Sequence, residues 1–200
     1  GQEHVRNISE WLDSRDGTRP FFMFVNRLEA HLPYDPPAEY RESMLRDLPS
    51  HAKIETRWAN EFNSGVHPHD RVNWSAYRRL YAGDVNTADD YLGEILDDLK
   101  QRGLYEDAVI IVTSDHGENL GEHGLVDHQF GVFETLLAIP LVIRAPGRLE
   151  VGTRNDPTMI SDLYATVLEA AGAPLSEPPD HSRSLFADPA PTDRPMVAEY

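Results

Sequence analysis

The chain has 200 residues, 40% of them hydrophobic and 9% aromatic, which is enough for one packed domain but not comfortably for two. Its 18 lysines and arginines against 34 aspartates and glutamates give a formal net charge of -16 at pH 7. So large a negative charge repels phosphate backbones and anionic lipids, and it excludes nucleic acid from the expected partners. Because the chain has no cysteine, it holds no disulfide, thiolate metal site or cysteine nucleophile.

The basic residues are unevenly chosen, because only Lys53 and Lys100 are lysines and the rest are arginines. An acidic, lysine-poor surface suggests a high-salt organism, since the Debye length falls to roughly 3 Å at 1 M salt and carboxylate repulsion is screened. The alternative is an ordinary acidic enzyme from a low-salt cell.

The chain has neither a run of roughly 18 apolar residues, as a membrane span needs, nor the basic-then-apolar start of a signal peptide. We therefore expect a soluble segment without a membrane span. If the high-salt interpretation is right, the expected location is the cytoplasm of a halophilic archaeon.

The predicted elements begin with a short amphipathic helix, because apolar residues recur at helical spacing over residues 5–12. Residues 21–25, FFMFV, form an apolar run typical of a strand that is covered on both faces of a parallel sheet. The end of this strand delivers His31. Residues 38–70 are mixed and polar, so we expect a long insertion-like excursion that supplies the walls of a substrate pocket.

The next predicted element is the longest helix, with near-helical apolar spacing over residues 72–100 and Gly103 as its terminator. Residues 108–113, AVIIVT, form a β-branched run that is typical of a buried central strand. A second such strand is predicted over residues 139–144. Strands that alternate with helices predict an α/β fold with a mainly parallel sheet flanked by helices.

A last helix is predicted to start with Ser161 or Asp162 as its cap and to end before Gly172, which would take a left-handed conformation. The sequence after Pro174 is rich in proline, aspartate and serine. We expect residues 174–200 to be a tail that wraps the surface.

Asp115 and His116 stand directly beyond the predicted central strand, where ligands of α/β sheets bind. A carboxylate oxygen next to an imidazole nitrogen suits a divalent cation. The alternative is a turn or capping pair, in which these two residue types also occur. The pair therefore predicts a metal site that its surroundings must support.

The following loop is punctuated by glycines, which allow its polar side chains to approach the same site. These side chains are Glu118, His123, Asp127 and His128. The alternative is that the two histidines only bind backbone carbonyls within the loop. His31, at the end of another predicted strand, could reach the same cavity, or it could satisfy the backbone of its own loop.

Residues 111–146, IVTSDHGENLGEHGLVDHQFGVFETLLAIPLVIRAP, resemble the downstream signature of the sulfatase family within the alkaline phosphatase superfamily. Residues 21–37, FFMFVNRLEAHLPYDPP, are similar to the segment that precedes it in those enzymes. Residues 81–99 and 162–172 resemble the helices that lie between and after these segments. The resemblance implies an alkaline-phosphatase-like fold, of which this chain is expected to form only the C-terminal part.

The resemblance also implies roles for individual residues. Asp115 and His116 would be metal ligands, most readily for Ca²⁺, with Mn²⁺, Zn²⁺ and Mg²⁺ as alternatives. His31 would contact the sulfate or phosphate oxyanion, and His128 would take the position of a substrate-contacting lysine or histidine. A cation and protonated imidazoles would stabilise charge on the non-bridging oxygens while one histidine protonates the leaving group.

The implied activity is metal-dependent hydrolysis of sulfate monoesters of a small molecule or glycan. Family members carry their nucleophile, often a formylglycine, in an N-terminal segment that nothing here matches, so we expect it outside this chain and expect the chain alone to be inactive. Self-association through an unpaired sheet edge is a further expectation.

Two alternative functions remain open at this point. His116, where many family members carry asparagine, favours a hydrolase of phosphate or phosphonate esters, or a phosphoethanolamine transferase. The other alternative is a non-catalytic acidic binding module that keeps the fold without a complete site.

Overall fold

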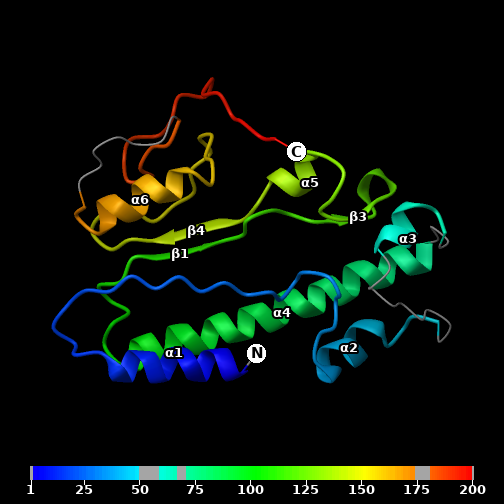
Figure 1. The fold of residues 1–200 in the computed structure, drawn as a ribbon, viewed down its shortest axis with the longest axis horizontal. Helices are drawn as coiled ribbons and strands as arrows, with labels where there is room; N and C mark the ends of the chain where they lie inside the picture. Colours follow the sequence, from blue (N-terminus) through cyan, green and yellow to red (C-terminus); the bar gives the residue numbers. More distant parts are fainter. Residues whose placement is uncertain (1, 50–58, 67–70, 174–180, 200) are drawn as a thin grey trace. The chain divides into compact units, whose positions relative to one another are not determined.

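The chain folds into two compact units in the computed structural model, which describes residues 2–49, 59–66, 71–173 and 181–199 (Figure 1). Unit 1 comprises residues 1–105 and 118–129, and unit 2 comprises residues 106–117 and 130–200. Within the described ranges, no helix is long and apolar enough to cross a membrane.

Unit 1 is built along α4 (Arg71–Gln101), which confirms the long helix predicted over residues 72–100. The first predicted helix is confirmed as α1 (Gln2–Ser14), and it packs against α4 (Figure 1). Arg102, just beyond α4, joins the two helices, because its guanidinium lies 2.5 Å from a carboxylate oxygen of Asp13. The C-terminal end of α1 is thereby tied to the end of α4.

The hydrophobic core of unit 1 gathers residues that lie far apart in the sequence. Its buried members are Tyr34, Ala59, Phe62, Tyr77, Leu80 and Val126. They come from the loop that follows His31, from α3 (Ala59–Asn63), from α4 and from β3 (Val126–Asp127). β3 pairs antiparallel with β2 (Asn119–Leu120). This core therefore fixes the His31 loop and the β2–β3 hairpin on α4.

The predicted excursion over residues 38–70 contains α2 (Ala38–Leu45), which packs on α4, and α3. Residues 50–58 and 67–70 lie outside the described residues, so the expected walls of a substrate pocket are described only in part.

The prediction of a strand over residues 21–25 is wrong. The segment is extended but has no ladder partner, and Phe22 and Phe24 expose 68% and 78% of their surface. Phe21 instead packs edge-on against Trp11 of α1, with ring centroids 5.5 Å apart. The reason is that a strand exists only when a neighbour accepts and donates its backbone hydrogen bonds, and no described segment does so here.

Unit 2 contains both of the other predicted strands, as β1 (Ile110–Thr113) and β4 (Leu141–Arg144). They pair antiparallel, with Ile110 opposite Arg144. The sequence led us to expect parallel strands. Parallel neighbours need a crossover that returns the chain to the opposite end of the sheet, whereas the segment containing the one-turn helix α5 (Glu134–Leu137) re-enters beside the end of β1.

The last predicted helix is confirmed as α6 (Asp162–Ala170), and Gly172 has the expected positive φ, of 66°. Ser161 occupies the N-cap position but makes no side-chain cap bond. The Asp162 carboxylate instead accepts hydrogen bonds from the backbone N–H groups of Met159 and Arg183, both at 2.9 Å. The helix start is thus tied to the C-terminal segment.

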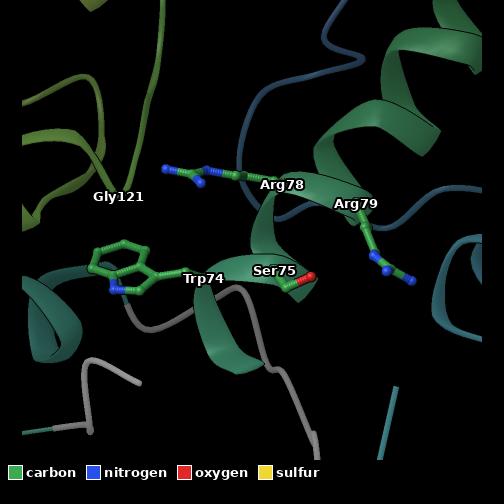
Figure 2. A pocket seen from close by; sticks show the side chains of 5 residues that line it. All are labelled: Trp74, Ser75, Arg78, Arg79 and Gly121. Carbon is green, nitrogen blue, oxygen red and sulfur yellow. The ribbon is translucent and has the colours of Figure 1, made fainter. Parts of the chain in front are cut away.

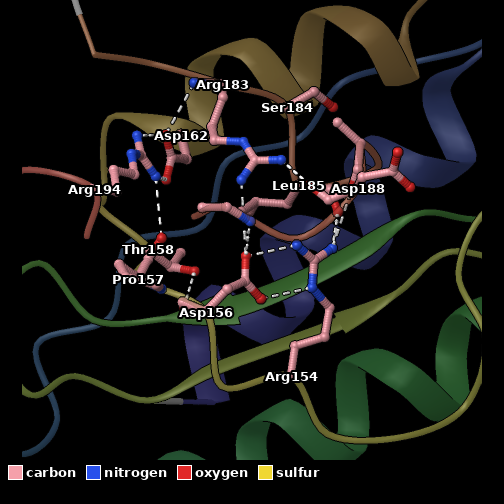
Figure 3. Close-up of polar contacts among 12 residues, drawn as sticks. Arg154, Asp156, Pro157, Thr158, Asp162, Arg183, Ser184, Leu185, Asp188 and Arg194 are labelled. Atoms are coloured by element: carbon pink, nitrogen blue, oxygen red, sulfur yellow. Dashed lines mark hydrogen bonds and ion pairs between the residues drawn. The ribbon is translucent and has the colours of Figure 1, made fainter. Parts of the chain in front are cut away.

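The C-terminal segment is held by a buried polar network, shown in Figure 3. Arg194 donates from both terminal nitrogens to the two oxygens of Asp162, each at 2.7 Å. Asp156 accepts two bonds from Arg154 and one from the backbone N–H of Ala190. Residues 181–199 therefore pack on α6 and on the loop before it, whereas residues 174–180 of the predicted tail lie outside the described residues.

Candidate active site

Tyr34 anchors the loop that carries His31 to the core of unit 1. Tyr34 exposes only 1% of its surface and meets the rings of Tyr77 and Tyr81 of α4 edge-on, at centroid distances of 6.1 and 5.6 Å. His31 itself is exposed, and its Nδ1 lies 2.7 Å from the carbonyl oxygen of Leu32. The anchored loop thus presents an imidazole at the surface of the unit.

A buried carboxylate of α4 also stabilises this loop. Asp84 exposes 5% of its surface and accepts a hydrogen bond from the backbone N–H of Asp35. Burial raises the pKa of Asp84 to about 6, although this hydrogen bond acts in the opposite direction. Next to it, Gly83 lies so close to Pro36 that an added Cβ would come within 2.8 Å of the proline ring. The loop therefore requires a residue without a side chain at position 83.

The β2–β3 hairpin positions the second histidine. Asn63 of α3 bonds both backbone groups of Val126, donating to its carbonyl at 2.9 Å and accepting from its N–H at 2.8 Å. Fully buried Asn119 donates to the carbonyl oxygen of Asp127 at 3.1 Å. These side-chain bonds extend a ladder of only two residues per strand, and they fix the backbone that carries His128.

Three side chains gather beside this hairpin, namely Glu118, Asp127 and His128, and their potential ligand atoms lie within 4.8 Å of one another. Nδ1 of His128 is 2.7 Å from Oδ1 of Asp127 and 3.9 Å from Oε1 of Glu118. The side chains of Glu118 and Asp127 are only 5% and 9% exposed, and that of His128 is 30% exposed. Two nearly buried carboxylates therefore face one nitrogen of a more accessible imidazole.

His31 belongs to the same cluster, because its ring centroid lies 5.1 Å from that of His128. Buried Tyr34 lies next to the Glu118 carboxylate of this cluster. Burial raises the pKa of the Tyr34 hydroxyl well above its ordinary value, and the negative charge of the Glu118 carboxylate adds to the shift. Tyr34 therefore remains a neutral hydrogen-bond donor.

The glycine-rich loop was predicted to bring four polar side chains together, and three of them do meet. His123 lies apart from this group, exposed at the tip of the hairpin with φ of 57°. Tyr34 was missed by sequence reasoning. The available signal was an aromatic residue between two prolines, in a loop that otherwise reads as polar.

A pocket of about 420 Å³ lies on unit 1 near the tip of the hairpin (Figure 2). It is lined by Trp74, Ser75, Arg78, Arg79 and Gly121. Both arginines are committed to the fold, since Arg78 donates to the carbonyl oxygen of Leu120 at 2.8 Å and Arg79 to that of Met44 at 3.0 Å. None of the residues predicted for the site lines this pocket.

The predicted metal ligands lie in unit 2, in the turn that follows β1. The Asp115 side chain is 80% exposed, and its Oδ1 lies 3.8 Å from Nε2 of His116. Nδ1 of His116 lies 2.8 Å from the carbonyl oxygen of Gly117. A carbonyl can only accept, so this bond places the proton on Nδ1 and makes Nε2 the nitrogen with a lone pair.

Hydrogen bonds to backbone carbonyl oxygens hold the turn that carries Asp115 and His116. The hydroxyl of Ser114 donates to the carbonyl oxygen of His116 at 2.7 Å, and the N–H of Gly117 donates to that of Leu136 at 2.8 Å. A Cβ on Gly117 would lie 2.1 Å from the carbonyl oxygen of Thr135, so only glycine fits there. An oxygen and a nitrogen donor held side by side suit a divalent ion, which would draw its remaining ligands from elsewhere.

Unit 2 thus carries a carboxylate-imidazole pair directly after a strand, and unit 1 carries histidines next to buried carboxylates. The family whose description is Sulfatase matches residues 2–173. The chain therefore belongs to the sulfatase family, within the alkaline phosphatase superfamily, and the predicted family and α/β fold are confirmed.

Individual relatives agree with this assignment. An endo-4-O-sulfatase of Bacteroides thetaiotaomicron is 28% identical over 180 residues, which cover 86% of this chain and 33% of the relative. A solved phosphonate monoester hydrolase of Silicibacter pomeroyi has a TM-score of 0.71 at 23% identity, covering 94% of this chain and 42% of that chain.

A second solved phosphonate monoester hydrolase, from Agrobacterium radiobacter, has a TM-score of 0.66 at 27% identity, and 90% of this chain matches 40% of that one. The chain thus spans between a third and about two fifths of the length of these relatives.

Proposed function

We propose that this protein is a metal-dependent hydrolase of sulfate monoesters, with a small molecule or a glycan as the organic part. The observation that carries the proposal is the rigid turn at Asp115 and His116, because it holds an oxygen and a nitrogen donor 3.8 Å apart in a chain of the sulfatase family. A bound divalent ion, which we propose to be Ca²⁺, would stabilise the negative charge that develops on the ester oxygens.

The proposal gives a role to four residues of this chain. Asp115 and His116 would hold the cation, and the carbonyl oxygen of Gly117, which accepts from Nδ1–H of His116, would leave Nε2 as the ligand atom. His31 and His128, with rings 5.1 Å apart, contact the non-bridging oxygens, and one of them protonates the leaving oxygen. The nucleophile, a formylglycine in many family members, belongs to a part of the protein outside residues 1–200, so the isolated chain would be inactive.

A second candidate function is hydrolysis of phosphonate or phosphate esters. The likeness in fold and sequence to the phosphonate monoester hydrolase of Agrobacterium radiobacter favours it specifically. His116 supports it as well, since many sulfatases carry asparagine at the matching position. Both reactions attack a tetrahedral ester that carries negative charge, so the same residues could serve either one.

The test uses the protein expressed from its complete native gene. Turnover of 4-nitrophenyl sulfate is compared with turnover of 4-nitrophenyl phenylphosphonate, before and after chelation and re-addition of Ca²⁺ or Mn²⁺. We expect the sulfate to be the better substrate. Asp115→Asn with His116→Ala should lower kcat/KM about 10³-fold, because a metal ion contributes several kcal/mol to the transition state.

Asp97→Asn is the matched control, because it removes an exposed carboxylate of α4 and should leave turnover unchanged. Preference for the phosphonate would favour the second candidate function. If neither ester is turned over by the complete protein under any metal condition, the protein is a binding module and the proposal fails.

A further inference from the structure

The accessible histidines of unit 1 differ in what their Nδ1 atoms face. Nδ1 of His31 faces a neutral carbonyl oxygen, that of Leu32, at 2.7 Å. Nδ1 of His128 faces two carboxylates, Asp127 at 2.7 Å and Glu118 at 3.9 Å. A carboxylate next to an imidazole nitrogen favours the imidazolium, in which both nitrogens donate, whereas a carbonyl oxygen carries no charge that would do so.

Hydrogen bonds hold the Asp127 carboxylate next to His128. Oδ1 of Asp127 also accepts a hydrogen bond from the backbone N–H of His128 at 2.7 Å, and Oδ2 accepts one from Gln129 at 3.2 Å. Asp127 adopts a positive φ of 74°, a conformation that aspartate and asparagine tolerate better than most residues. The Glu118 side chain is only 5% exposed, and its carboxylate contributes to the raised pKa of buried Tyr34.

We propose that Asp127 and Glu118 are positioning residues that keep His128 cationic, so that it can stand where other family members use a lysine. The proposal rests on the proposed function, because it concerns how His128 meets a charged ester. Nδ1 lies within ion-pair distance of both carboxylates, and on the imidazolium Nε2–H is then a charged donor for an ester oxygen. The charged and titratable groups next to His128 are Asp127, Glu118 and His31, and Tyr34 interacts with the two carboxylates.

The main variant is Asp127→Asn, which keeps the side-chain shape and the positive φ but removes the charge. Its matched control is Glu122→Gln, which neutralises a carboxylate of the same hairpin that pairs with Arg78 instead. In the complete native protein, we expect the basic limb of the kcat/KM profile to move to lower pH in Asp127→Asn. The loss at pH 8 should be about tenfold and should vanish at acidic pH.

A lysine at position 128 separates a charge effect from a structural one. His128→Lys supplies a cation that needs no adjacent carboxylate at neutral pH, so adding Asp127→Asn to it should change kcat/KM less than about twofold. If the double variant loses as much as Asp127→Asn alone, Asp127 serves only the fold of the hairpin and the proposal is overturned.

A measurement that needs no turnover decides the proposal even if the proposed function fails. Histidine labelled with ¹³C at Cε1 is followed by NMR through a pH titration, with His128→Gln to assign the signal. The midpoint for His128 should fall in Asp127→Asn and in Glu118→Gln but not in Glu122→Gln. An unchanged midpoint contradicts the proposal, and so does a Ca²⁺- or Zn²⁺-induced shift of the signal that Asp127→Asn abolishes, since the cluster would then be a metal site.

Discussion

Asp162 joins the start of α6 to the C-terminal segment of unit 2. Its carboxylate is fully buried and accepts four hydrogen bonds, two from Arg194 and one each from the backbone N–H groups of Met159 and Arg183 (Figure 3). The Arg194 side chain is itself only 9% exposed and also donates to the carbonyl oxygen of Pro157 at 3.1 Å. Removing the carboxylate leaves this guanidinium buried and uncompensated.

We therefore expect Asp162→Ala to lower the free energy of unfolding by about 3–5 kcal/mol, as found when one partner of a buried ion pair is removed. Arg194→Met should cost less, because Asp162 would keep its two backbone donors. The double variant should cost less than the sum of the single variants, since each removes the charge that the other leaves unpaired. Burial raises the pKa of Asp162, but Arg194 and the backbone donors outweigh burial and hold it below 3.8.

The pH dependence follows from that lowered pKa. The contribution of Asp162 to stability is complete above 3.8 and is lost as pH falls through the lower pKa of the folded state. Urea unfolding of the complete native protein, followed by circular dichroism, measures the loss, and limited proteolysis within residues 181–199 localises it. Exposed Asp193→Ala is the control and should change stability by less than about 0.5 kcal/mol. A cost below about 1 kcal/mol for Asp162→Ala would refute the reasoning.

Three further predictions concern unit 1. Burial holds the pKa of Asp84 at about 6, against 3.8 in the unfolded chain, so the free energy of unfolding falls as pH rises between these values. We therefore expect Asp84→Asn to be more stable than the wild type at pH 7.5 but not at pH 4, as measured by the urea midpoints. Gly121→Ala should lower the free energy of unfolding by about 2–4 kcal/mol in the same assay, because the new Cβ would lie 2.7 Å from the Trp74 ring and the residue has a φ of 116°. Gly65→Ala is the control. Its Cβ would meet open space, so it should cost only about 1 kcal/mol for its positive φ. His31→Lys should lower kcat/KM more than His128→Lys in the ester assay, because the lysine would lose the hydrogen bond that Nδ1 of His31 makes to the Leu32 carbonyl, whereas His128 stands at a position where a lysine serves in other family members.

Local patterns in the sequence were sufficient for elements whose stability is local. The β-branched run over residues 108–113 predicted β1, and the apolar spacing over residues 72–100 predicted α4 to within a residue at either end. Residues 21–25 have an equally strong strand pattern but form no strand, because pairing depends on a neighbour rather than on the segment itself. The antiparallel pairing of β1 with β4 likewise depends on the path of the chain between them.

The candidate site shows the same division between local and tertiary information. Motif resemblance singled out His31 and His128, which lie 97 positions apart, and the fold brings their rings to 5.1 Å from each other. The contribution of Tyr34 could not be predicted, because its burial depends on rings of α4 that approach only in the folded unit. The sequence placed Glu118 and Asp127 in the right loop, but only the hairpin register turns both carboxylates toward the same nitrogen.

The three histidines proposed for function share one feature, since each has its Nδ1 next to an oxygen. For His31 and His116 the oxygen belongs to a backbone carbonyl, which can only accept a hydrogen bond from Nδ1–H. For His128 the oxygens belong to Asp127 and a second carboxylate, which favour a charged ring. In each case Nε2 is the atom proposed to meet the cation or the ester, and a charged ring binds an anion through Nε2–H. The atoms that neighbour each Nδ1, rather than the histidines as such, therefore divide the proposed roles among them.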